Sequence, residues 1–302
     1  MELSMQYPEV VTFGEVLWDL LPSGKVLGGA PGNVAYRLTE RGINAAVVSR
    51  IGADEIGKDL LAAFTEKGIS CDYIQIEPEY PTGTVNVTLN SEGNPHFELL
   101  ANVAYDRIEF NERVKEAARQ AKVVYFGTLV QRSRQTADSL FRLLAEAESA
   151  IKVLDINLRE GCYSKESVHA SLEFANIVKV NESEVSKVGQ LLGLDSSSVD
   201  RFAVALFDGY PDIETVLVTL GEAGVEAFVR GGTKVKKPTK KVVVKDTIGS
   251  GDAFTAGFIY GKIKDAPIEK CCEYGNILGA LAATKSGGMG SITDQEVLGA
   301  GW

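Results

Sequence analysis

A short polar segment, residues 246–254, has residue types and spacing suited to binding a phosphate group. It reads Asp-Thr-Ile-Gly-Ser-Gly-Asp-Ala-Phe and separates a valine-rich run from a predicted helix. Glycines let the backbone approach a ligand closely, and the first amides of a helix are free to bind an anion. Gly249, Ser250 and Gly251 are therefore candidates for an anion hole, with Asp252 as a candidate base in the first helical turn. The alternative is a helix N-cap formed by Ser250 or Asp252.

The common nucleotide-binding motifs are absent from the sequence. None of its Gly-Lys pairs is followed by Ser or Thr, as a P-loop requires. The glycines at 249 and 251 do not form G-x-G-x-x-G. They also follow a strand late in the chain, whereas a dinucleotide-binding fingerprint follows the first strand of its fold. A G-x-S-x-G elbow is also missing, so serine-hydrolase chemistry is not expected.

Two polar residues early in the chain are candidates for binding a polyol. The run Gly28-Gly-Ala-Pro-Gly-Asn33 leads into a helix predicted to begin near Gly32, with Asn33 in its first turn. A structural cap is the alternative interpretation. Asp19 lies in an otherwise apolar predicted strand, where a carboxylate needs a polar partner. A sugar hydroxyl would serve.

Length, composition and charge bound the class of protein. The chain has 302 residues, of which 45% are hydrophobic and 24% charged, as is ordinary for globular proteins. Its net charge of -10 argues against a broad nucleic-acid surface, because phosphate backbones are bound mainly by clustered Lys and Arg. The one basic cluster, residues 234–245, alternates with valines and is predicted to be a solvated strand face.

Cysteine usage and hydropathy bear on the compartment. The four cysteines include no C-x-x-C pair and the two histidines are far apart, so we expect no structural zinc site. No secretory leader pattern opens the sequence, and no apolar run approaches the ~18 residues of a membrane helix. We therefore expect a cytoplasmic protein with reduced thiols and neither a membrane nor a nucleic-acid partner.

Short apolar runs alternate with segments of helical period through most of the chain. This alternation favours βαβ units and a parallel sheet. The predicted fold is a Rossmann-like α/β/α sandwich with a central, mostly parallel sheet, built as a single domain over residues 1–302. The expected strands include residues 10–13, 45–51, 123–126, 151–156, 177–180, 216–219, 225–229 and 242–244.

Two stretches interrupt this alternation and contain turn residues. Turns are predicted at residues 22–24 and 91–94, and apolar and polar residues alternate around both. The pattern predicts antiparallel strands outside the main sheet. We expect these strands to form a small lid hinged at Gly28-Gly29, although ordinary surface hairpins are the alternative. The lid is expected to span about residues 15–28 and 83–103.

Together these features resemble the ribokinase-like (PfkB) family of carbohydrate kinases, and within it the bacterial and plant fructokinases. The early motif is residues 28–35, Gly-Gly-Ala-Pro-Gly-Asn-Val-Ala, and the late one is residues 246–254. Between them, in the family's order, lie Asp155-Ile-Asn-Leu-Arg159, Asn181-Glu-Ser-Glu184 and Thr219-Leu-Gly221. The resemblance spans nearly the whole chain and implies an ATP-dependent sugar kinase.

The resemblance implies a role for each motif in phosphoryl transfer. Asp252 would take the proton from a primary hydroxyl of the sugar, while the amides of residues 249–251 bind the transferring group. Asn181 and Glu184 match an N-x-x-E motif that positions Mg²⁺, through water. The positions matching ATP contacts are Thr219 and Gly221, near the phosphates and ribose, and Asn276, near the adenine.

Sugar contacts are also implied by the resemblance. Asp19, Gly29 and Asn33 match positions that hold sugar hydroxyls. Phe97 on the lid would close over the substrate, and Arg159 resembles an arginine near the substrate or the phosphates. Lids in this family often pair edge to edge, which implies a homodimer.

A loop late in the chain resembles the family's monovalent-cation site. Its backbone carbonyls would bind K⁺ beneath the anion hole and help to set its shape, without taking part in the chemistry. The residues implied are Asp246, Ile248, Ala282, Lys285, Gly287 and Ser291.

One departure from the fructokinase pattern bears on the substrate. The pattern places an arginine after the lid strand, where this chain has Ala101. The predicted lid and substrate segments offer few basic residues besides Lys25 and Arg159, which favours a neutral ketohexose, with fructose first. Another sugar, a sugar acid or a nucleoside stays open as substrate. So does a sugar-binding regulatory protein without useful catalysis.

Overall fold

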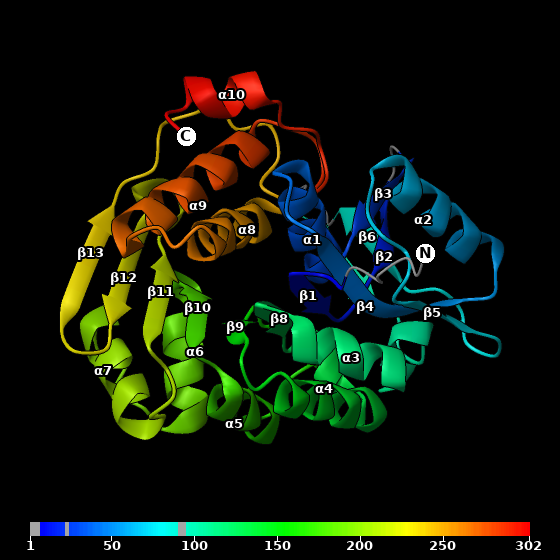
Figure 1. Ribbon diagram of the computed structural model, residues 1–302, viewed down its shortest axis with the longest axis horizontal. Coiled ribbons are helices and arrows are strands. Elements are labelled where there is room, and N and C mark those ends of the chain that lie inside the picture. Colours follow the sequence, from blue (N-terminus) through cyan, green and yellow to red (C-terminus); the bar gives the residue numbers. More distant parts are fainter. Residues whose placement is uncertain (1–6, 22–23, 90–94) are drawn as a thin grey trace, which may run out of the picture.

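A computed structural model gives the protein's architecture (Figure 1). It describes residues 7–21, 24–89 and 95–302, with the backbone alone for residues 87–89 and 95–97. Most of the two predicted turns, at 22–24 and 91–94, lies outside the described residues. The elements assemble into a large central sheet, helices on both of its faces, and a second, smaller sheet.

The main sheet has nine strands among the described residues, in the order β13-β12-β11-β10-β9-β8-β1-β4-β5. Neighbours from β11 to β5 pair in parallel, and β12 and β13 add an antiparallel edge. Strands of a parallel sheet are buried on both faces, which is why they read as apolar runs. The predicted mostly parallel α/β/α fold is confirmed. The strands are β1 Val10–Phe13, β4 Ala45–Gly52, β5 Ile74–Glu77, β8 Val123–Gly127, β9 Ile151–Asp155, β10 Ile177–Asn181, β11 Thr215–Thr219, β12 Val225–Val229 and β13 Thr233–Lys237.

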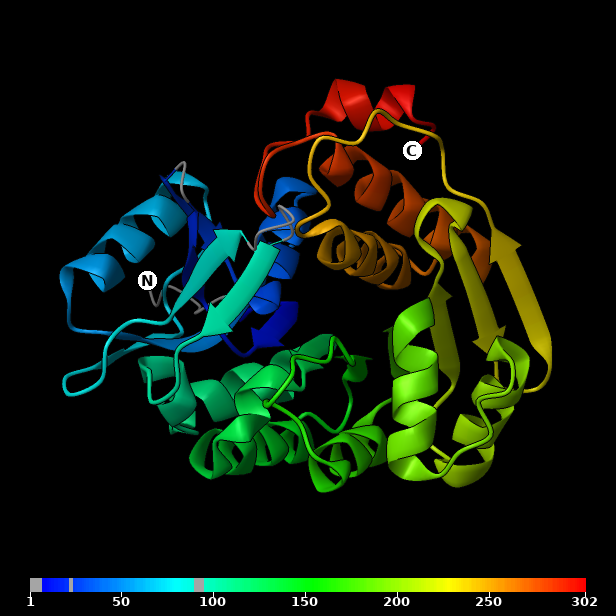
Figure 2. The same cartoon turned by 180° about the vertical axis from the view of Figure 1, so that it is seen from behind.

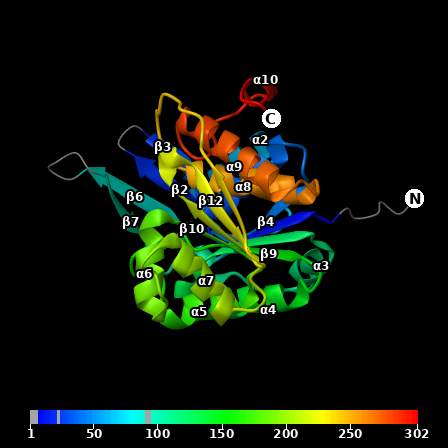
Figure 3. The same cartoon turned by 90° about the vertical axis from the view of Figure 1, so that its left-hand side faces the viewer.

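Helices pack on both faces of this sheet (Figure 3). Successive side chains of a strand point to opposite faces. In β1, Val11 and Phe13 face the core formed with α3 to α7, while Val10 faces the core formed with α1, α2, α8 and α9. The first group comprises α3 Glu112–Gln120, α4 Arg134–Glu146, α5 Lys165–Phe174, α6 Glu182–Leu192 and α7 Val199–Gly209. The others are α1 Ala30–Glu40, α2 Glu55–Glu66, α8 Ser250–Ile263, α9 Ile268–Ala283 and α10 Asp294–Gly299, with short 3₁₀ helices η1 Ala104–Arg107, η2 Leu129–Arg132 and η3 Gly221–Ala223.

The second sheet has the strand order β3-β2-β6-β7 and stands beside the main sheet, next to α2 (Figure 2). The outer pairs are antiparallel, as expected, but β2 and β6 at its centre pair in parallel. The expectation of antiparallel strands was wrong for this pair, because the two hairpins come from distant parts of the chain and a hairpin turn does not fix how they join. The strands are β2 Leu17–Leu21, β3 Gly24–Gly28, β6 Thr84–Leu89 and β7 Pro95–Leu99.

The strand predicted at residues 242–244 was also wrong. The sheet ends with β13, and an irregular loop follows it up to α8. Pro238 lacks the amide that a further ladder would need, and the Val243 side chain is 90% exposed. The alternation of valines and lysines here belongs to a loop. Within the described residues, no helix is both long and apolar enough to cross a membrane.

Candidate active site

Helix α8 begins where the anion hole is predicted. Its N-cap, Gly249, has left-handed φ and ψ angles of 75° and 1°, and no side chain in the described part of the chain caps the helix. A Cβ on Gly249 would lie 2.4 Å from the Gly288 Cα, so only glycine fits. The Ser250 Oγ is buried and finds no partner among the described residues. The N-cap alternative is therefore wrong. The Ser250 amide donates to the Thr247 carbonyl at 3.1 Å, so among the three predicted donors the amides of Gly249 and Gly251 are the ones open to an anion.

Asp252, in the first turn of α8, contacts the early motif directly. The Asn33 Nδ2 donates a hydrogen bond to the Asp252 Oδ2 at 2.7 Å, between residues 219 positions apart. The Asn33 Oδ1 is buried and has no partner among the described residues. Burial and the nearby Asp155 carboxylate raise the pKa of Asp252, while Asn33 and Lys179 act in the opposite direction. The fold thus brings the candidate base and a candidate sugar ligand together.

A buried ion pair lies beneath this turn. The Lys179 Nζ donates to both carboxylate oxygens of Asp155, at 3.1 and 3.0 Å, and Asp155 is fully buried. The Thr255 Oγ1, in the second turn of α8, lies 3.3 Å from the Asp155 Oδ2. A Cβ on Gly251 would lie 3.1 Å from the Lys179 Nζ, so the ammonium sits directly under the anion hole. Burial lowers the pKa of Lys179, but Asp155 outweighs it and the net shift is upward.

Carboxylates line the side of the site next to the second sheet. Asp19, on β2, packs against Gly28, and burial raises its pKa to about 6. Glu15 accepts a hydrogen bond from the Ala30 amide at 3.2 Å, and burial raises its pKa to about 7. The Arg159 guanidinium acts to lower the pKa of Asp19, Glu15 and Asp252 alike. This side therefore combines negative charge with one arginine.

Gly29 joins the second sheet to α1. Its φ of 100° lies in the region that favours glycine, and a Cβ there would lie 2.4 Å from the Glu15 carbonyl oxygen. Pro31 follows in the first turn of α1, where its missing amide has no cost. The backbone of residues 28–30 is thus held at close quarters, beside both Glu15 and Asp19.

A pocket of about 600 Å³ opens on the other side of the α8 N-terminus. Its walls come from the ends of β10 and β11, the loop after β13, α8 and α9. Asn276 does not point freely into it, because its Nδ2 donates to the carbonyls of Lys237 and Pro238 at 3.0 and 3.3 Å. The sequence-predicted residues that line the pocket are Asn181, Thr219, Gly221, Ser250, Gly251 and Asn276.

Asn181 and Glu184 form a reciprocal cap at the start of α6. The Asn181 Oδ1 accepts from the Glu184 amide at 3.0 Å, and the Glu184 Oε2 accepts from the Asn181 amide at 2.9 Å. The second oxygen of Glu184 accepts from the Leu158 amide at 2.8 Å, and the side chain is only 4% exposed. Asn181 lines the pocket and Glu184 stands behind it. No cluster of three or more acidic, His or Cys ligands occurs in the described residues. This donor set fits a Mg²⁺ held mainly by water and phosphate oxygens.

The loop between α9 and α10 packs against the N-cap of α8, where a Cβ on Gly249 would lie 2.4 Å from the Gly288 Cα. The Asp246 carboxylate accepts from the Gly287 and Ile248 amides, at 2.8 and 2.9 Å. The Ser291 Oγ donates to the Glu40 Oε1 at 3.1 Å, and the Lys285 Nζ donates to the Glu296 Oε1 at 2.5 Å. The side chains of Lys285 and Ser291 are therefore bound to Glu296 and Glu40. The family resemblance implies a K⁺ role only for the backbone carbonyls of this loop. Ala282 and Ala283, at the end of α9, are buried beside this loop.

The residues of the predicted lid are described only in part. Phe97 lies on β7, and its side chain is outside the described residues. Near Ala101, an arginine from another element is present: the Arg132 Nη2 donates to the Leu100 carbonyl at 2.6 Å. The same guanidinium binds both carboxylate oxygens of Asp106. Arg132 is the last residue of η2. The sequence did not indicate it, because only the fold brings Leu100 and Asp106 beside it.

Some residues of the site were missed at the sequence level although a signal existed. Lys179 stands in the apolar strand Ile177–Asn181, where a charge requires a partner, by the same reasoning applied to Asp19. Glu15 also gave a signal, because it is a charged residue between Gly14 and the apolar Val16. Tyr125 lines a small cavity together with Glu15, and its buried hydroxyl has no partner among the described residues. Unlike the other two it gave no signal, because tyrosine is common in buried strands.

Known proteins match this chain in sequence and in fold. The family model for pfkB family carbohydrate kinases matches residues 22–295. A fructokinase-1 of Oryza sativa subsp. japonica is 30% identical over 96% of each chain. An uncharacterized sugar kinase of Pyrococcus horikoshii in complex with ATP is 25% identical and has a TM-score of 0.82, covering 96% of this chain and 97% of that one. A double mutant of the Vibrio cholerae fructokinase, bound to fructose, ADP and a potassium ion, is 23% identical and has a TM-score of 0.79, covering 94% and 95%.

The family model and the curated relatives define the class of protein, an enzyme that phosphorylates carbohydrates, and its fold is a mostly parallel α/β sheet. This chain belongs to the pfkB family of carbohydrate kinases. The resemblance stated from the sequence motifs is thereby confirmed, and so is the assignment to an enzyme of the kinase class.

Proposed function

We propose that the enzyme transfers the γ-phosphoryl group of ATP to a primary hydroxyl of a neutral sugar, and that this sugar is D-fructose, giving D-fructose 6-phosphate. The observation that carries the proposal is the 2.7 Å hydrogen bond between Asn33 and Asp252, at the uncapped start of α8. It joins a residue suited to holding a sugar hydroxyl to a carboxylate suited to accepting its proton. The anion hole of residues 249–251 begins in the same turn.

In this mechanism the residues act mainly by positioning and by electrostatics. The Asp252 carboxylate accepts the proton of the sugar hydroxyl, whose oxygen forms a bond to the γ-phosphorus. The bond from that phosphorus to the β–γ bridging oxygen breaks, and ADP leaves. Charge developing on the phosphoryl oxygens would be met by the amides of Gly249 and Gly251, and by that of Ser250 once it exchanges the Thr247 carbonyl for the phosphoryl group. Lys179 adds a positive charge beneath them and favours the ionised form of Asp252.

The pocket next to α8 would hold the nucleotide. Its volume of about 600 Å³ is within the range of cofactor sites, and it ends at Ser250 and Gly251, where the γ-phosphate must lie. Thr219 and Gly221 would contact the phosphates and ribose, and Asn276 would shape the adenine end by fixing the loop after β13. Mg²⁺, placed near Asn181 through water, would neutralise charge on the phosphates; Glu184 would hold Asn181 in place.

The sugar would bind between α1 and the second sheet. Asp19, Gly29 and Asn33 would meet its hydroxyls, with Arg159 at the edge and Phe97 above. The buried carboxyls Asp19 and Glu15 disfavour an anionic sugar, because burial already opposes their own ionisation and would penalise a further negative charge in the same way. This supports a neutral substrate over a sugar phosphate or sugar acid.

Three further features belong to the same proposal. The second sheet would close as a lid over the bound sugar and exclude water, which would otherwise compete as phosphoryl acceptor. Its exposed strand edges would pair two chains into a homodimer in the cytoplasm. The carbonyls of the loop after α9, with those near Asp246, would bind K⁺ as an activator. The positions concerned are Asp246, Ile248, Ala282, Lys285, Gly287 and Ser291.

A substrate panel tests the proposal. Purified enzyme is assayed for ADP release with ATP and Mg²⁺, with neutral sugars, sugar phosphates, sugar acids and nucleosides, each with and without K⁺. Fructose should give the highest kcat/KM, and NMR of the product should show the phosphate on carbon 6. A higher kcat/KM with a sugar acid, a sugar phosphate or a nucleoside would refute the assignment of substrate. No acceptor-dependent release with any member would refute catalysis of this kind altogether.

A further inference from the structure

A buried arginine on α1 plays no part in the mechanism above. Arg37 follows Asn33 by one helical turn, and its side chain is 0% exposed, the largest fully buried side chain in the described part of the chain. Burying a guanidinium costs several kcal/mol unless charges and acceptors compensate it. A residue of this kind in the helix that carries the candidate sugar ligand calls for an explanation beyond packing.

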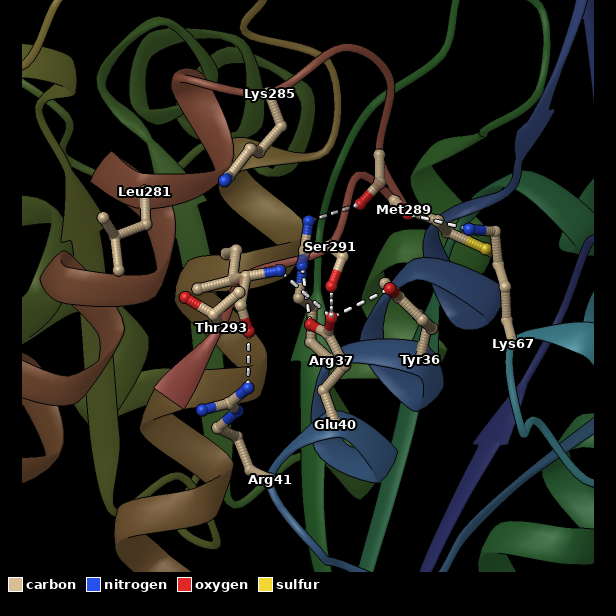
Figure 4. Close-up of polar contacts among 12 residues, drawn as sticks. Tyr36, Arg37, Glu40, Arg41, Lys67, Leu281, Lys285, Met289, Ser291 and Thr293 are labelled. Carbon is tan, nitrogen blue, oxygen red and sulfur yellow. Dashed lines mark hydrogen bonds and ion pairs between the residues drawn. The ribbon is translucent and has the colours of Figure 1, made fainter. Parts of the chain in front are cut away.

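The partners of Arg37 lie on its own helix and on the loop between α9 and α10 (Figure 4). Its Nη1 donates to the Glu40 Oε2 at 2.7 Å, and its Nη2 donates to the Gly288 carbonyl at 3.1 Å. Glu40 in turn accepts from the Ser291 Oγ and the Ile292 amide, both at 3.1 Å. The pair therefore fastens the loop to α1 at two points, one of which is the backbone of Gly288.

Gly288 is in contact with both halves of the site. A Cβ on Gly288 would lie 2.4 Å from the Asn33 Oδ1 and 2.5 Å from its Nδ2. From the other direction, a Cβ on Gly249 would lie 2.4 Å from the Gly288 Cα. The peptide that Arg37 holds is thus packed between the amide side chain that bonds Asp252 and the N-cap of α8.

We propose that Arg37 is a positioning residue for phosphoryl transfer: by holding the Gly288 carbonyl against α1, it keeps Asn33 and Gly249 in register across Gly288, so that the sugar hydroxyl and the anion hole meet at Asp252. This inference rests on the proposed function. It does not require Arg37 to touch the sugar or the nucleotide. A shift of Gly288 would displace both Asn33 and Gly249, because each is packed closely against it.

The same loop offers a matched control. The Arg41 Nη2 donates to the Ile292 carbonyl at 2.7 Å, and its Nη1 pairs with Asp294 at 2.8 Å. Arg41 thus fastens the loop to the end of the same helix through the same chemistry, but at the far side from Gly288. A loss of loop anchoring alone would affect both variants equally.

The test compares Arg37→Met with Arg41→Met, measuring kcat, both KM values and the thermal midpoint Tm. Misplacement by about 1 Å can cost roughly 100-fold in rate, so we expect kcat of Arg37→Met to fall about 10- to 100-fold, with an increased KM for the sugar. The KM for ATP should stay within about twofold, because the pocket near Asn276 and Thr219 does not contact this loop. Arg41→Met should lower Tm yet keep kcat within about twofold of wild type.

A second variant covers the case in which Arg37→Met does not fold with Glu40 left unpaired. Arg37→Met/Glu40→Gln removes both charges while the glutamine Oε1 still accepts from Ser291 and Ile292, and the same kinetic result is expected. A folded variant of either kind with kcat and sugar KM within about twofold of wild type overturns the inference, as does an equal loss in Arg41→Met. If wild type turns over and the Arg37 variants keep its kcat and sugar KM, this inference is refuted while the proposed function stands. No turnover by wild type across the substrate panel refutes the proposed function, and this inference with it.

Discussion

Asp252 is a carboxylate whose surroundings oppose its ionisation, although the proposed reaction needs the ionised form. Burial and Asp155 raise its pKa, and the positive charge of Lys179 counteracts part of that effect. The base must be unprotonated to accept the hydroxyl proton, so activity falls as pH falls through this pKa. The residues that set the Asp252 pKa therefore set the acid limit of the enzyme.

Replacing Lys179 should move that limit. In Lys179→Met the positive charge is lost, the pKa of Asp252 rises further, and the acid limb of the kcat/KM profile shifts to higher pH. The unpaired Asp155 should also lower the free energy of unfolding by about 3–5 kcal/mol. A pH–rate profile and a urea titration measure the two effects.

Thr255→Ala is the control for this prediction, because it removes a neutral donor to the same carboxylate. Its acid limb should stay close to that of wild type. A limb that stays in place in Lys179→Met, or moves to lower pH, would contradict the electrostatic role given to Lys179.

At the scale of elements, the junction of α8 with the loop after α9 allows no side chain at Gly249. In Gly249→Ala the free energy of unfolding should fall by about 1–2 kcal/mol because of the left-handed backbone, and by a further amount because the new Cβ meets Gly288. Displacing the N-cap should also lower kcat by at least about tenfold. Denaturant unfolding and steady-state kinetics measure both.

Gly42→Ala separates the two causes. Gly42 has the same φ of 75°, but a Cβ there meets nothing within 4 Å. In Gly42→Ala the free energy of unfolding should fall only by the amount due to the left-handed backbone, and kcat should equal that of wild type. Equal losses of stability in the two variants, with kcat of Gly249→Ala unchanged, would show that close packing at the anion hole has no role.

Which elements could be predicted from the sequence follows from how local their causes are. The parallel strands are buried on both faces, so they appear as apolar runs such as residues 216–219, whatever their neighbours. The segment at 242–244 looked similar, yet no strand of the described residues pairs with it. The parallel pairing of β2 with β6 likewise depends on how two distant hairpins meet. Pairing is a property of the fold, and a single segment does not encode it.

The residues of the site could in part be proposed from the sequence, whereas the contacts between them could not. Asp252, Asn33 and Asn181 could be proposed because their types and spacing match motifs. The hydrogen bond that joins Asn33 to Asp252 could not, since it spans 219 positions. Nor could the contact of Arg37 with Gly288, because on a helix wheel Arg37 reads as an ordinary polar residue.

For the whole molecule, the proposed lid movement can be followed through a tryptophan. Trp18 adjoins Asp19 on β2, is buried, and its Nε1 donates to the Ile56 carbonyl of α2 at 3.1 Å. Closure of the second sheet over a sugar would change this contact and the emission of Trp18. Trp302, the other tryptophan, packs against Tyr274 with ring centroids 4.5 Å apart, far along the chain.

We therefore predict that, in Trp302→Phe, fructose changes the Trp18 emission in a saturable manner. Adding Asp19→Ala should abolish the response, because that variant lacks the carboxylate proposed to hold the sugar. The measurement is a fluorescence titration with fructose, and glycerol serves as a control for solvent effects. A response that survives in Asp19→Ala, or its absence in Trp302→Phe, would contradict the coupling of sugar binding to this sheet.

The most direct test of the central claim is the rate of fructose-dependent ADP release by Asp252→Asn, beside its affinity for ATP. The substitution keeps the size of the side chain and removes its capacity to accept a proton. The account predicts a fall in kcat of about 10²- to 10⁴-fold, with the Kd for ATP unchanged within about twofold. A variant that folds, binds ATP and retains kcat within about tenfold of wild type would contradict the role of Asp252 as the base.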